Sequence, residues 1–375
     1  MRIVYCINNT RYSGGVTRVL ANKANYFVEN GYEVYIITTD QDCFKPRYFL
    51  SPKIICVDLG INYFKTDSQP FYKRLVSFLV SFFKHKNKLK HVLKDIDPDI
   101  VISTFTKDMY IIPFIRGRFK TILEIHGSRF GWLSTRKNRW FIGQIQNAVD
   151  ELILEKYDKV VLLTDQERKY WMGLNNVSVI PNSNTFESEV VSKLNNKIAI
   201  AVGRYAEEKQ LDHLIYAWKE VHDVFSEWTL HIIGDGGSLK EQLQSIIRKL
   251  GLKDSVLLKD PSMDIKKEYL KSSIYLMTSK HEGLGMVLLE AQVCGLPIVS
   301  YDCETGPLEV VENGENGFLV NSGDIKLFAK KAIKLIENES LRREMGRKSK
   351  LRSKNYSEYK VMGRWSELFR ELVNT

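Results

Sequence analysis

The chain has 375 residues and a formal net charge of +10, with 44% hydrophobic and 27% charged residues. At ordinary domain sizes this composition predicts a folded protein of two domains, and it excludes a mainly disordered, collagen-like or coiled-coil chain. The longest nearly uninterrupted apolar run, Leu75–Phe83, is far shorter than the roughly 20 residues that a membrane-spanning helix needs.

The cysteine content indicates the kind of cellular compartment in which the protein works. The five cysteines are odd in number and form no Cys-x-x-Cys pair, which argues against a disulfide scaffold or a structural zinc site. They favour a reducing compartment, and the chain begins without a signal-peptide pattern, so we expect a cytoplasmic protein.

The positive charge is concentrated in the N-terminal half. Residues 1–189 carry 27 basic and 19 acidic side chains, whereas the remainder carries 28 and 26. The N-terminal half should therefore face an anionic partner: nucleic acid, a membrane surface or a phosphorylated substrate.

The N-terminal half opens with a strand, a loop, a helix and a second strand. The apolar stretch Arg2–Ile7 precedes the polar turn Asn8–Gly15, helical spacing of apolar residues over Val16–Glu29, and the apolar stretch Val34–Thr39. Such a unit implies parallel strands joined by a right-handed crossover. Further strands are predicted at Ile54–Leu59, Ile100–Thr104, Thr121–His126, Lys159–Thr164 and Val177–Ile180.

A second alternating series begins near residue 197. Its predicted strands are Ile198–Val202, Thr229–Ile233, Val256–Lys259, Ile274–Thr278, Ile298–Tyr301 and Gly317–Val320, and its predicted helices include Leu211–Val224, Ser238–Leu250, Gly285–Cys294 and one long stretch over Lys330–Lys354. Two such series predict an α/β protein of two doubly wound, Rossmann-like domains that meet at the polar stretch Asn182–Asn196. The cleft between the sheets is the expected ligand site, because strand ends and helix starts meet there.

The strongest candidate site is the sequence SKHEGLGMVLLEA, which begins at Ser279. Gly283 and Gly285 follow a predicted strand and precede an apolar helix, whose first backbone N–H groups suit a phosphate. Glu282 and Glu290 are separated by about 12 Å if helical, wider than the roughly 5–9.5 Å of a glycosidase pair. This spacing suits the two ends of a sugar nucleotide. One surface glutamate and one helix-capping glutamate would show the same pattern.

Smaller features lie at other predicted strand ends. Arg204 and Lys209 follow the first strand of the second series, Gly14 and Gly15 follow the first strand of the chain, and His126 ends a strand of the first series. Two cations at such a place can hold a diphosphate without a metal. The plainer interpretations are solvated surface charges for Arg204 and Lys209, an ordinary turn for Gly14 and Gly15, and a structural role for His126. The glycine pair is no complete GxGxxG, which argues against a dinucleotide-dependent enzyme.

Taken in order, these sequences resemble the retaining glycosyltransferases of family 4, which have the GT-B fold and an E-x7-E motif. The resemblance is carried by SGGV in the first loop, IHG at Ile125–Gly127, VIPNS at Val179–Ser183, VGRYAEEKQLDHLI from Val202, GDGGSLKEQL from Gly234, the E-x7-E sequence itself and AQVCGLPIVSYDCETGPLEVVENGENGFLV after it. It implies an acceptor-binding domain over 1–185 and a nucleotide-sugar-binding domain over 196–355. It also implies a final helix within 356–375 that crosses back to the first domain.

The resemblance implies a role for each candidate residue. Arg204 and Lys209 would neutralise the pyrophosphate of the donor, His126 would lie by the donor hexose, Glu282 would bind sugar hydroxyls and Glu290 would hold the ribose. Backbone N–H groups would meet phosphate at Leu284, Gly285, Met286 and Val287, and the donor would be approached closely at Gly14, Gly15, Gly234 and Gly283. The implied catalytic group is His126, Glu282, Arg204 and Lys209, with no metal and no cofactor.

The implied activity is transfer of a hexose, with retention of configuration, from a nucleotide-diphosphate sugar to a glycan hydroxyl. Family frequency suggests a UDP-linked donor and a role in bacterial surface polysaccharide or lipopolysaccharide assembly. A sugar-nucleotide epimerase of GT-B fold and a non-catalytic sugar-nucleotide-binding protein are the alternatives. Two departures leave base recognition open: Gly285 stands where many members have proline, and Asp260-Pro261 replaces a frequent glycine.

The segment 73–94 is the clearest feature of the acceptor side. It carries seven Lys or Arg residues and no Asp or Glu, interleaved with apolar residues. A basic amphipathic helix can lie in an anionic membrane interface, which would place the protein on the inner face of the cytoplasmic membrane. The alternative is a core-packed helix with a solvated basic rim. A lipid-linked glycan acceptor would explain the basic face, whereas no nucleic-acid-binding motif accompanies the charge.

Overall fold

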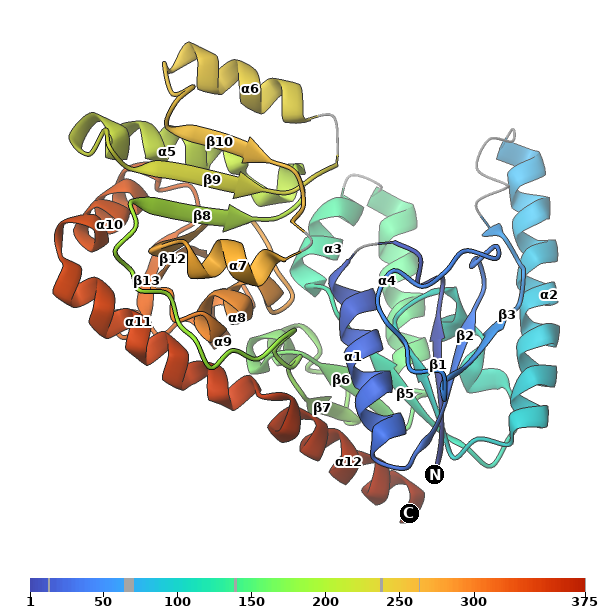
Figure 1. The fold of residues 1–375 in the computed structure, drawn as a ribbon. Coiled ribbons are helices and arrows are strands. Elements are labelled where there is room, and N and C mark those ends of the chain that lie inside the picture. Colours follow the sequence, from blue (N-terminus) through green and yellow to red (C-terminus); the bar gives the residue numbers. More distant parts are fainter. Residues whose placement is uncertain (13, 64–70, 138–139, 237–238, 263, 375) are drawn as a thin grey trace.

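The computed structural model of the chain describes all residues except 13, 64–70, 138–139, 237–238, 263 and 375. Two parallel sheets, each covered by helices, stand side by side (Figure 1). Within the described residues the strand order is β3-β2-β1-β4-β5-β6-β7 in the seven-stranded N-terminal sheet and β10-β9-β8-β11-β12-β13 in the six-stranded C-terminal sheet. In each sheet the order reverses beside the first strand, where doubly wound folds form a ligand crevice. The predicted fold class is confirmed.

The inner strands of the N-terminal sheet are buried on both faces, which explains why they are continuous apolar runs. Its strands are β1 (Arg2–Ile7), β2 (Glu33–Thr38), β3 (Ile55–Asp58), β4 (Ile100–Ser103), β5 (Lys120–Glu124), β6 (Lys159–Leu162) and β7 (Val177–Val179). Its helices are α1 (Gly15–Glu29), α2 (Phe71–Ile96), α3 (Arg129–Lys137) and α4 (Trp140–Leu154), with 3-10 turns at Lys107–Tyr110, Ile112–Phe114 and Asp165–Tyr170. Alternate strand residues serve opposite cores: Tyr5 packs with α1, and Cys6 packs with α2 and α4.

The C-terminal sheet has the same layered construction. Its strands are β8 (Ile198–Val202), β9 (Thr229–Ile233), β10 (Val256–Lys259), β11 (Ile274–Met277), β12 (Ile298–Asp302) and β13 (Gly317–Asn321). The helices are α5 (Leu211–Val224), α6 (Leu239–Lys249), α7 (Ile265–Leu270), α8 (Met286–Val293), α9 (Pro307–Val310), α10 (Ile325–Glu337) and α11 (Glu339–Ser353), with a 3-10 turn at Glu207–Lys209. One core lies under α5, α6 and α10, and the other lies under α7 and α8.

The predicted helical stretch over residues 330–354 is divided between two helices. Helix α10 ends at Glu337 and α11 begins at Glu339, because Asn338 adopts an extended conformation. The Asn338 side chain accepts a hydrogen bond from the Leu341 backbone N–H at 2.9 Å and so caps α11. Asparagine is a preferred helix N-cap, since its side chain satisfies a backbone donor that the helix leaves unpaired. The break lets α11 pack against α8.

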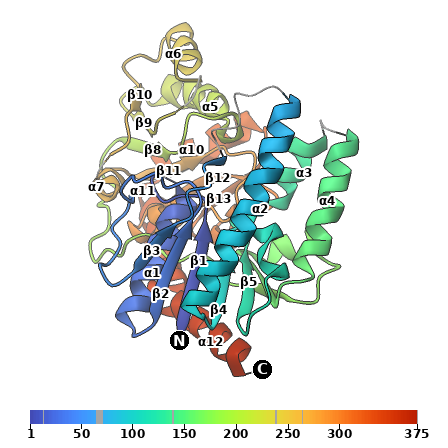
Figure 2. The ribbon, with the colours of Figure 1, turned by 90° about the vertical axis from the view of Figure 1, so that its right-hand side faces the viewer.

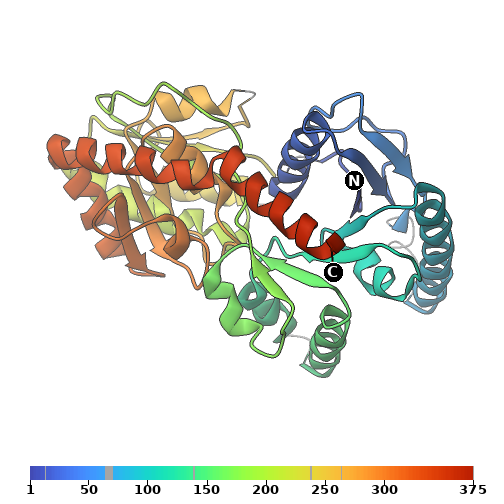
Figure 3. The ribbon, with the colours of Figure 1, turned by 90° about the horizontal axis from the view of Figure 1, so that it is seen from below.

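The last helix leaves the C-terminal half and lies on the N-terminal half. After a 3-10 turn at Lys354–Tyr356, α12 (Glu358–Asn374) runs along the underside of the molecule toward the N-terminal sheet (Figure 3). Phe369 is fully buried there, with its ring centroid 5.1 Å from that of Phe27 on α1. The Asn184 backbone N–H donates to the Tyr356 carbonyl at 2.8 Å, so the two crossings between the halves lie side by side.

Candidate active site

The carboxyl edges of the two sheets meet at the E-x7-E sequence. A Cβ atom added to Gly283 would lie only 2.3 Å from the His126 carbonyl oxygen, so the two loops approach at a distance that only glycine allows. The first loop of the chain reaches the same region, since a Cβ atom added to Gly15 would lie 3.8 Å from the Met286 side chain. The structure thus brings the glycine loop, His126 and the E-x7-E sequence to one interdomain crevice, as the positions at strand ends predicted.

Lys209 and Glu282 form an ion pair at this crevice. The Lys209 Nζ lies 2.6 Å from the Glu282 Oε1, and their side chains are only 18% and 13% exposed. Lys209 closes the turn after β8 and Glu282 lies in the loop after β11, and these strands are neighbours in the sheet. Neighbouring parallel strands therefore place a cation and a carboxylate together although 73 positions separate them in the sequence.

Arg204 lies at the same sheet edge but points differently. Its side chain is 71% exposed, and its Nη2 lies 2.7 Å from the Glu208 Oε1. Gly234 stands nearby in the loop after β9, where a Cβ atom would lie 1.8 Å from the Gly203 carbonyl oxygen. Arg204 is thus exposed and paired with Glu208, whereas Gly234 is needed for the packing of two loops.

Helix α8 begins directly after the glycine-rich turn. Gly285 precedes it with a φ of 81°, a left-handed conformation that glycine favours, and no side chain caps the helix start. Leu284 is buried in the core below, whereas Met286 and Val287 are half-buried. An uncapped helix start carries partial positive charge on its backbone N–H groups, which suits an anionic ligand. Gly14 lies before α1 in extended backbone, also without a side-chain cap.

Glu290 is the buried member of the motif. Its Oε1 accepts a hydrogen bond from the Thr185 hydroxyl at 2.7 Å, and its Oε2 accepts one from the Tyr269 hydroxyl at 2.9 Å. The Arg18 Nη1 of α1 lies 3.8 Å from the Oε1, so Glu290 joins segments from both halves of the chain. Burial raises the pKa of the Glu290 carboxyl, and the Thr185 bond and the Arg18 charge oppose that rise.

Arg18, Thr185 and Tyr269 were absent from the sequence prediction. Only Arg18 carried a usable signal, because it lies one helical turn after Gly15 and so at the start of the helix beside the crevice. The other two come from segments that the fold brings to Glu290 from 105 and 21 positions away.

His126 belongs to a buried polar group. It lies two residues beyond β5 rather than at the strand end, because β5 stops at Glu124. The His126 Nε2 and the Lys23 Nζ lie 3.1 Å and 2.7 Å from the same Glu124 oxygen, and all three side chains are at most 7% exposed. Among the described residues the buried His126 Nδ1 has no hydrogen-bond partner. This ring nitrogen therefore has unused hydrogen-bonding capacity.

The Lys23–Glu124 ion pair is buried, with side chains that are 3% and 4% exposed. Burial raises the pKa of the Glu124 carboxyl, but Lys23 and His126 outweigh burial and lower that pKa to about 2. Burial likewise lowers the pKa of the Lys23 ammonium, and Glu124 opposes that effect. The Lys23 Nζ also lies 3.7 Å from the ring centroid of Trp365 on α12. The sequence analysis missed this pair. A lysine within the apolar face of α1, beside Leu20 and Ala24, was the signal that could have revealed it.

The described part of the chain lacks two kinds of feature. No three His, Cys, Asp or Glu side chains in the described ranges are grouped so that they could hold a metal ion. None of the helices, as far as their residues are described, is long and apolar enough to cross a membrane. Ser13 of the SGGV motif and residues 237–238 of the GDGGSLKEQL motif lie outside the described residues.

Two Rossmann-like sheets that face each other across such a crevice define the GT-B class of glycosyltransferase. Residues 13–183 match the family model "Glycosyltransferase Family 4", and residues 183–352 match the model "Glycosyl transferases group 1". A Haemophilus influenzae protein described as an uncharacterized glycosyltransferase is 30% identical over 370 residues, which are 97% of this chain and 98% of that protein. The chain therefore belongs to glycosyltransferase family 4, as its motifs indicated.

Two further proteins place the chain among its relatives. The amylovoran biosynthesis glycosyltransferase AmsD of Erwinia amylovora is 33% identical over 222 residues, covering 56% of this chain and 62% of AmsD. The solved structure of Anabaena HepE in complex with UDP has a TM-score of 0.76 and 18% identity, covering 99% of this chain and 100% of HepE. The fold is therefore shared with HepE. The family models and the relatives confirm the predicted enzyme class, glycosyltransferase.

Proposed function

We propose that this glycosyltransferase moves a hexose, with retention of configuration, from a UDP-linked sugar to a glycan hydroxyl during assembly of a bacterial surface polysaccharide. The observation that carries the proposal is the enclosed Lys209–Glu282 pair, 2.6 Å apart, beside the uncapped start of α8. The relative AmsD, which is named for amylovoran biosynthesis, supports the polysaccharide, and HepE with its bound UDP supports the nucleotide.

Both glutamates of the motif have acceptor capacity left for such a donor. A carboxylate offers about four lone-pair positions. Thr185 and Tyr269 use one position on each oxygen of Glu290, so the ribose hydroxyls can donate to the others. Glu282 accepts from Lys209 through its Oε1 and keeps further positions for hydroxyls of the hexose. The His126 Nδ1 would meet the hexose from the opposite sheet.

The bond-breaking step places negative charge next to Lys209. The bond from the anomeric carbon to the diphosphate oxygen breaks, and a bond from that carbon to the acceptor oxygen forms on the same face. The acceptor proton passes to the leaving diphosphate. Lys209, Arg204 and the start of α8 would stabilise the growing charge more in the transition state than before it, which lowers the barrier. These groups supply the charge that a metal would otherwise provide, and we propose that the enzyme needs none.

A panel of sugar nucleotides tests the donor. A UDP-hexose at about 100 times its dissociation constant should stabilise the protein by about 2.7 kcal/mol, seen as a melting temperature several degrees higher, and GDP-linked and ADP-linked sugars should stabilise it less. With an acceptor present, NMR of the product should show the anomeric configuration of the donor, and exhaustive chelation should leave the rate unchanged. Isomerisation of the donor sugar without an acceptor would instead identify an epimerase.

We also propose that α2 rests on an anionic membrane surface, where a lipid-linked acceptor would be found. Val76, Leu79, Val80 and Phe83 are between 48% and 63% exposed, and their spacing places them on one face of the helix. The opposite face, with Leu89, is buried against the N-terminal sheet. Figure 2 shows α2 along the outside of the N-terminal half, and exposed lysines follow the apolar face at positions 84, 88, 90 and 94. Apolar and basic groups together are typical of interfacial helices.

Vesicle co-sedimentation tests this surface. Replacing Leu79 and Phe83 together by serine should lower the fraction bound to vesicles of phosphatidylcholine and phosphatidylglycerol at least about tenfold, because each side chain would lose apolar burial. Tyr359→Ser is the control, since Tyr359 is 80% exposed on α12. Equal binding to vesicles of phosphatidylcholine alone would contradict the proposal.

A further inference from the structure

Two loops of the N-terminal half form a surface beside the donor crevice. They are residues 8–12, which follow β1, and residues 39–50, which follow the neighbouring strand β2. The Arg47 backbone N–H donates to the Thr10 carbonyl at 2.8 Å, and the Thr10 N–H donates to the Gln41 Oε1 at 2.9 Å. The Thr17 hydroxyl donates to the Tyr12 carbonyl at 3.0 Å, so this surface continues into the start of α1.

Arg11 is stacked between two aromatic rings at the centre of this surface. Its Cζ lies 4.7 Å from the ring centroid of Tyr12 and 5.0 Å from that of Phe44. The two aromatic residues are 56% and 57% exposed. Within the described part of the chain, the buried Arg11 Nε has no hydrogen-bond partner and no carboxylate pairs with the guanidinium. Aromatic stacking thus holds a planar cation in place, and no anion of the described protein neutralises it.

The surrounding charges favour an external anion. Lys45 and Arg47 are exposed on the second loop, whereas the carboxylate of Asp40 is buried and accepts from the Tyr63 backbone N–H at 2.6 Å. Asp42 is the remaining acidic residue of the two loops. Cations therefore outnumber available carboxylates on this surface, which raises the local concentration of anions.

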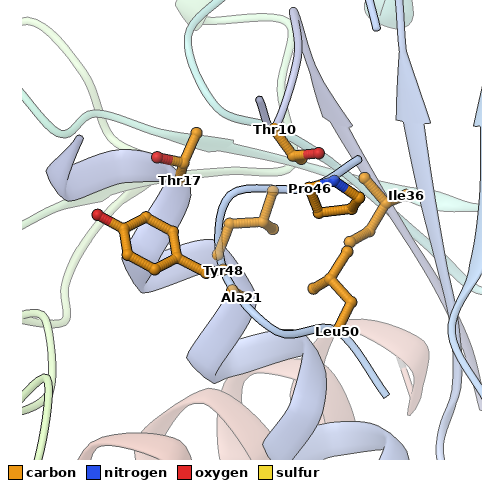
Figure 4. Close-up of a pocket in the computed structure, with 8 residues that line it drawn as sticks. Thr10, Thr17, Ala21, Ile36, Pro46, Tyr48 and Leu50 are labelled. Atoms are coloured by element: carbon orange, nitrogen blue, oxygen red, sulfur yellow. The ribbon is translucent and has the colours of Figure 1, made fainter. Parts of the chain in front are cut away.

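The surface also connects to the donor site. Arg18 lies over the Tyr48 ring, with its Cζ 5.6 Å from the centroid, and its Nη1 lies 3.8 Å from Glu290. Between α1 and the second loop lies a shallow hollow, which is lined in part by Thr10, Thr17 and Tyr48 (Figure 4). A ligand on the Arg11 surface would therefore lie next to the nucleotide sugar.

We propose that Arg11, Tyr12 and Phe44 form an acceptor subsite for an acidic glycan. A sugar ring would lie on an exposed aromatic face, and its phosphate or carboxylate would bind the Arg11 guanidinium through charge-assisted hydrogen bonds. A neutral glycan would leave the cation unpaired, so the subsite selects acceptors that carry an acidic group. This inference rests on the proposed function, because it needs a donor sugar at the neighbouring crevice.

NMR titration of the full chain with UDP present tests the subsite. The probes are glucose 6-phosphate, glucuronic acid, glucose and inorganic phosphate, observed at the backbone N–H groups of Thr10 and Arg47, which join the two loops and are kept in the variants. Both acidic sugars should bind at least about tenfold more weakly to Arg11→Gln, because the charge-assisted bonds are lost. The dissociation constant of UDP should not change. Arg116→Gln is the matched control. Arg116 is exposed in the loop before β5, at the amino ends of the strands, whereas the two loops of the proposed subsite follow the carboxyl ends of β1 and β2.

A second variant separates the aromatic faces from the charge. Tyr12→Ser/Phe44→Ser should weaken the acidic sugars and leave the binding of inorganic phosphate nearly unchanged. The inference is overturned if glucose binds as tightly as its acids, if Arg11→Gln binds all probes like the wild type, or if inorganic phosphate matches glucose 6-phosphate. Loss of UDP binding in the wild type would instead refute the proposed donor and leave the comparison among sugars intact.

Discussion

Replacing Lys209 by alanine is expected to lower kcat by about 10²–10³-fold, the cost of removing one group that stabilises charge in a transition state. Lys209 is only 18% exposed and lies at the carboxyl edge of the sheet, beside the start of α8. Its removal should also weaken UDP binding about tenfold, because a hydrogen bond to a charged group is lost. Initial rates with a saturating donor and calorimetric titration with UDP measure the two effects.

The partner of Lys209 allows a sharper test. If Lys209 served only to neutralise Glu282, Lys209→Ala/Glu282→Gln should recover the activity that Lys209→Ala loses. A cation that acts on the diphosphate predicts no such recovery. Lys219→Ala is the control. Lys219 belongs to the same C-terminal half as Lys209, but it pairs with Asp223 on the surface of α5. Unchanged UDP affinity and kcat in Lys209→Ala would refute the assignment.

Replacing Lys23 by methionine is expected to destabilise the N-terminal half by about 3–5 kcal/mol, the usual cost of leaving one charge of a buried pair without its partner. The Glu124 carboxyl would then be buried beside His126 alone, and its pKa would no longer be held near 2 by the ammonium. Urea denaturation followed by tryptophan fluorescence, to which Trp365 beside Lys23 contributes, measures the change.

The pKa of Glu124 determines how the destabilisation caused by Lys23→Met should change with pH. The folded-state pKa of Glu124 lies below its ordinary value of 4.5, so its contribution to stability is present above that value and is lost as pH falls toward 2. The loss caused by Lys23→Met should therefore be large at neutral pH and should shrink as acid protonates Glu124.

A double variant and a surface control complete the test of the buried pair. Lys23→Met/Glu124→Gln should regain most of the stability, because removing both charges of a buried pair is often nearly neutral. Lys53→Met, at an exposed lysine of the same half, should leave the midpoint unchanged. Equal stability of Lys23→Met and the wild type would show that the pair does not hold α1 to the sheet.

Much of the architecture and the centre of the site could be read from local patterns. Parallel strands buried on both faces are apolar runs, and the alternation of such runs with helical spacing predicted two doubly wound domains. The candidate residues Lys209, Glu282 and His126 all follow strands of these sheets. The ends of parallel strands gather at one edge, so their positions along the chain already implied that they would meet.

The partners of these residues depended on tertiary structure. Thr185 and Tyr269 reach Glu290 from other segments, and Lys23 reaches Glu124 across 101 positions. The break at Asn338 is different, because asparagine is a preferred helix N-cap and so carried a local signal.

Composition, spacing and motifs determined the family, the order of the elements and the residues that carry the chemistry, because those properties are local to the chain or repeat along it. Only the folded molecule decided which of these charges are buried, which are paired and which, like Arg11, have no carboxylate partner among the described residues. Pairing and burial depend on distances between segments that are remote in sequence, and no local pattern specifies such distances.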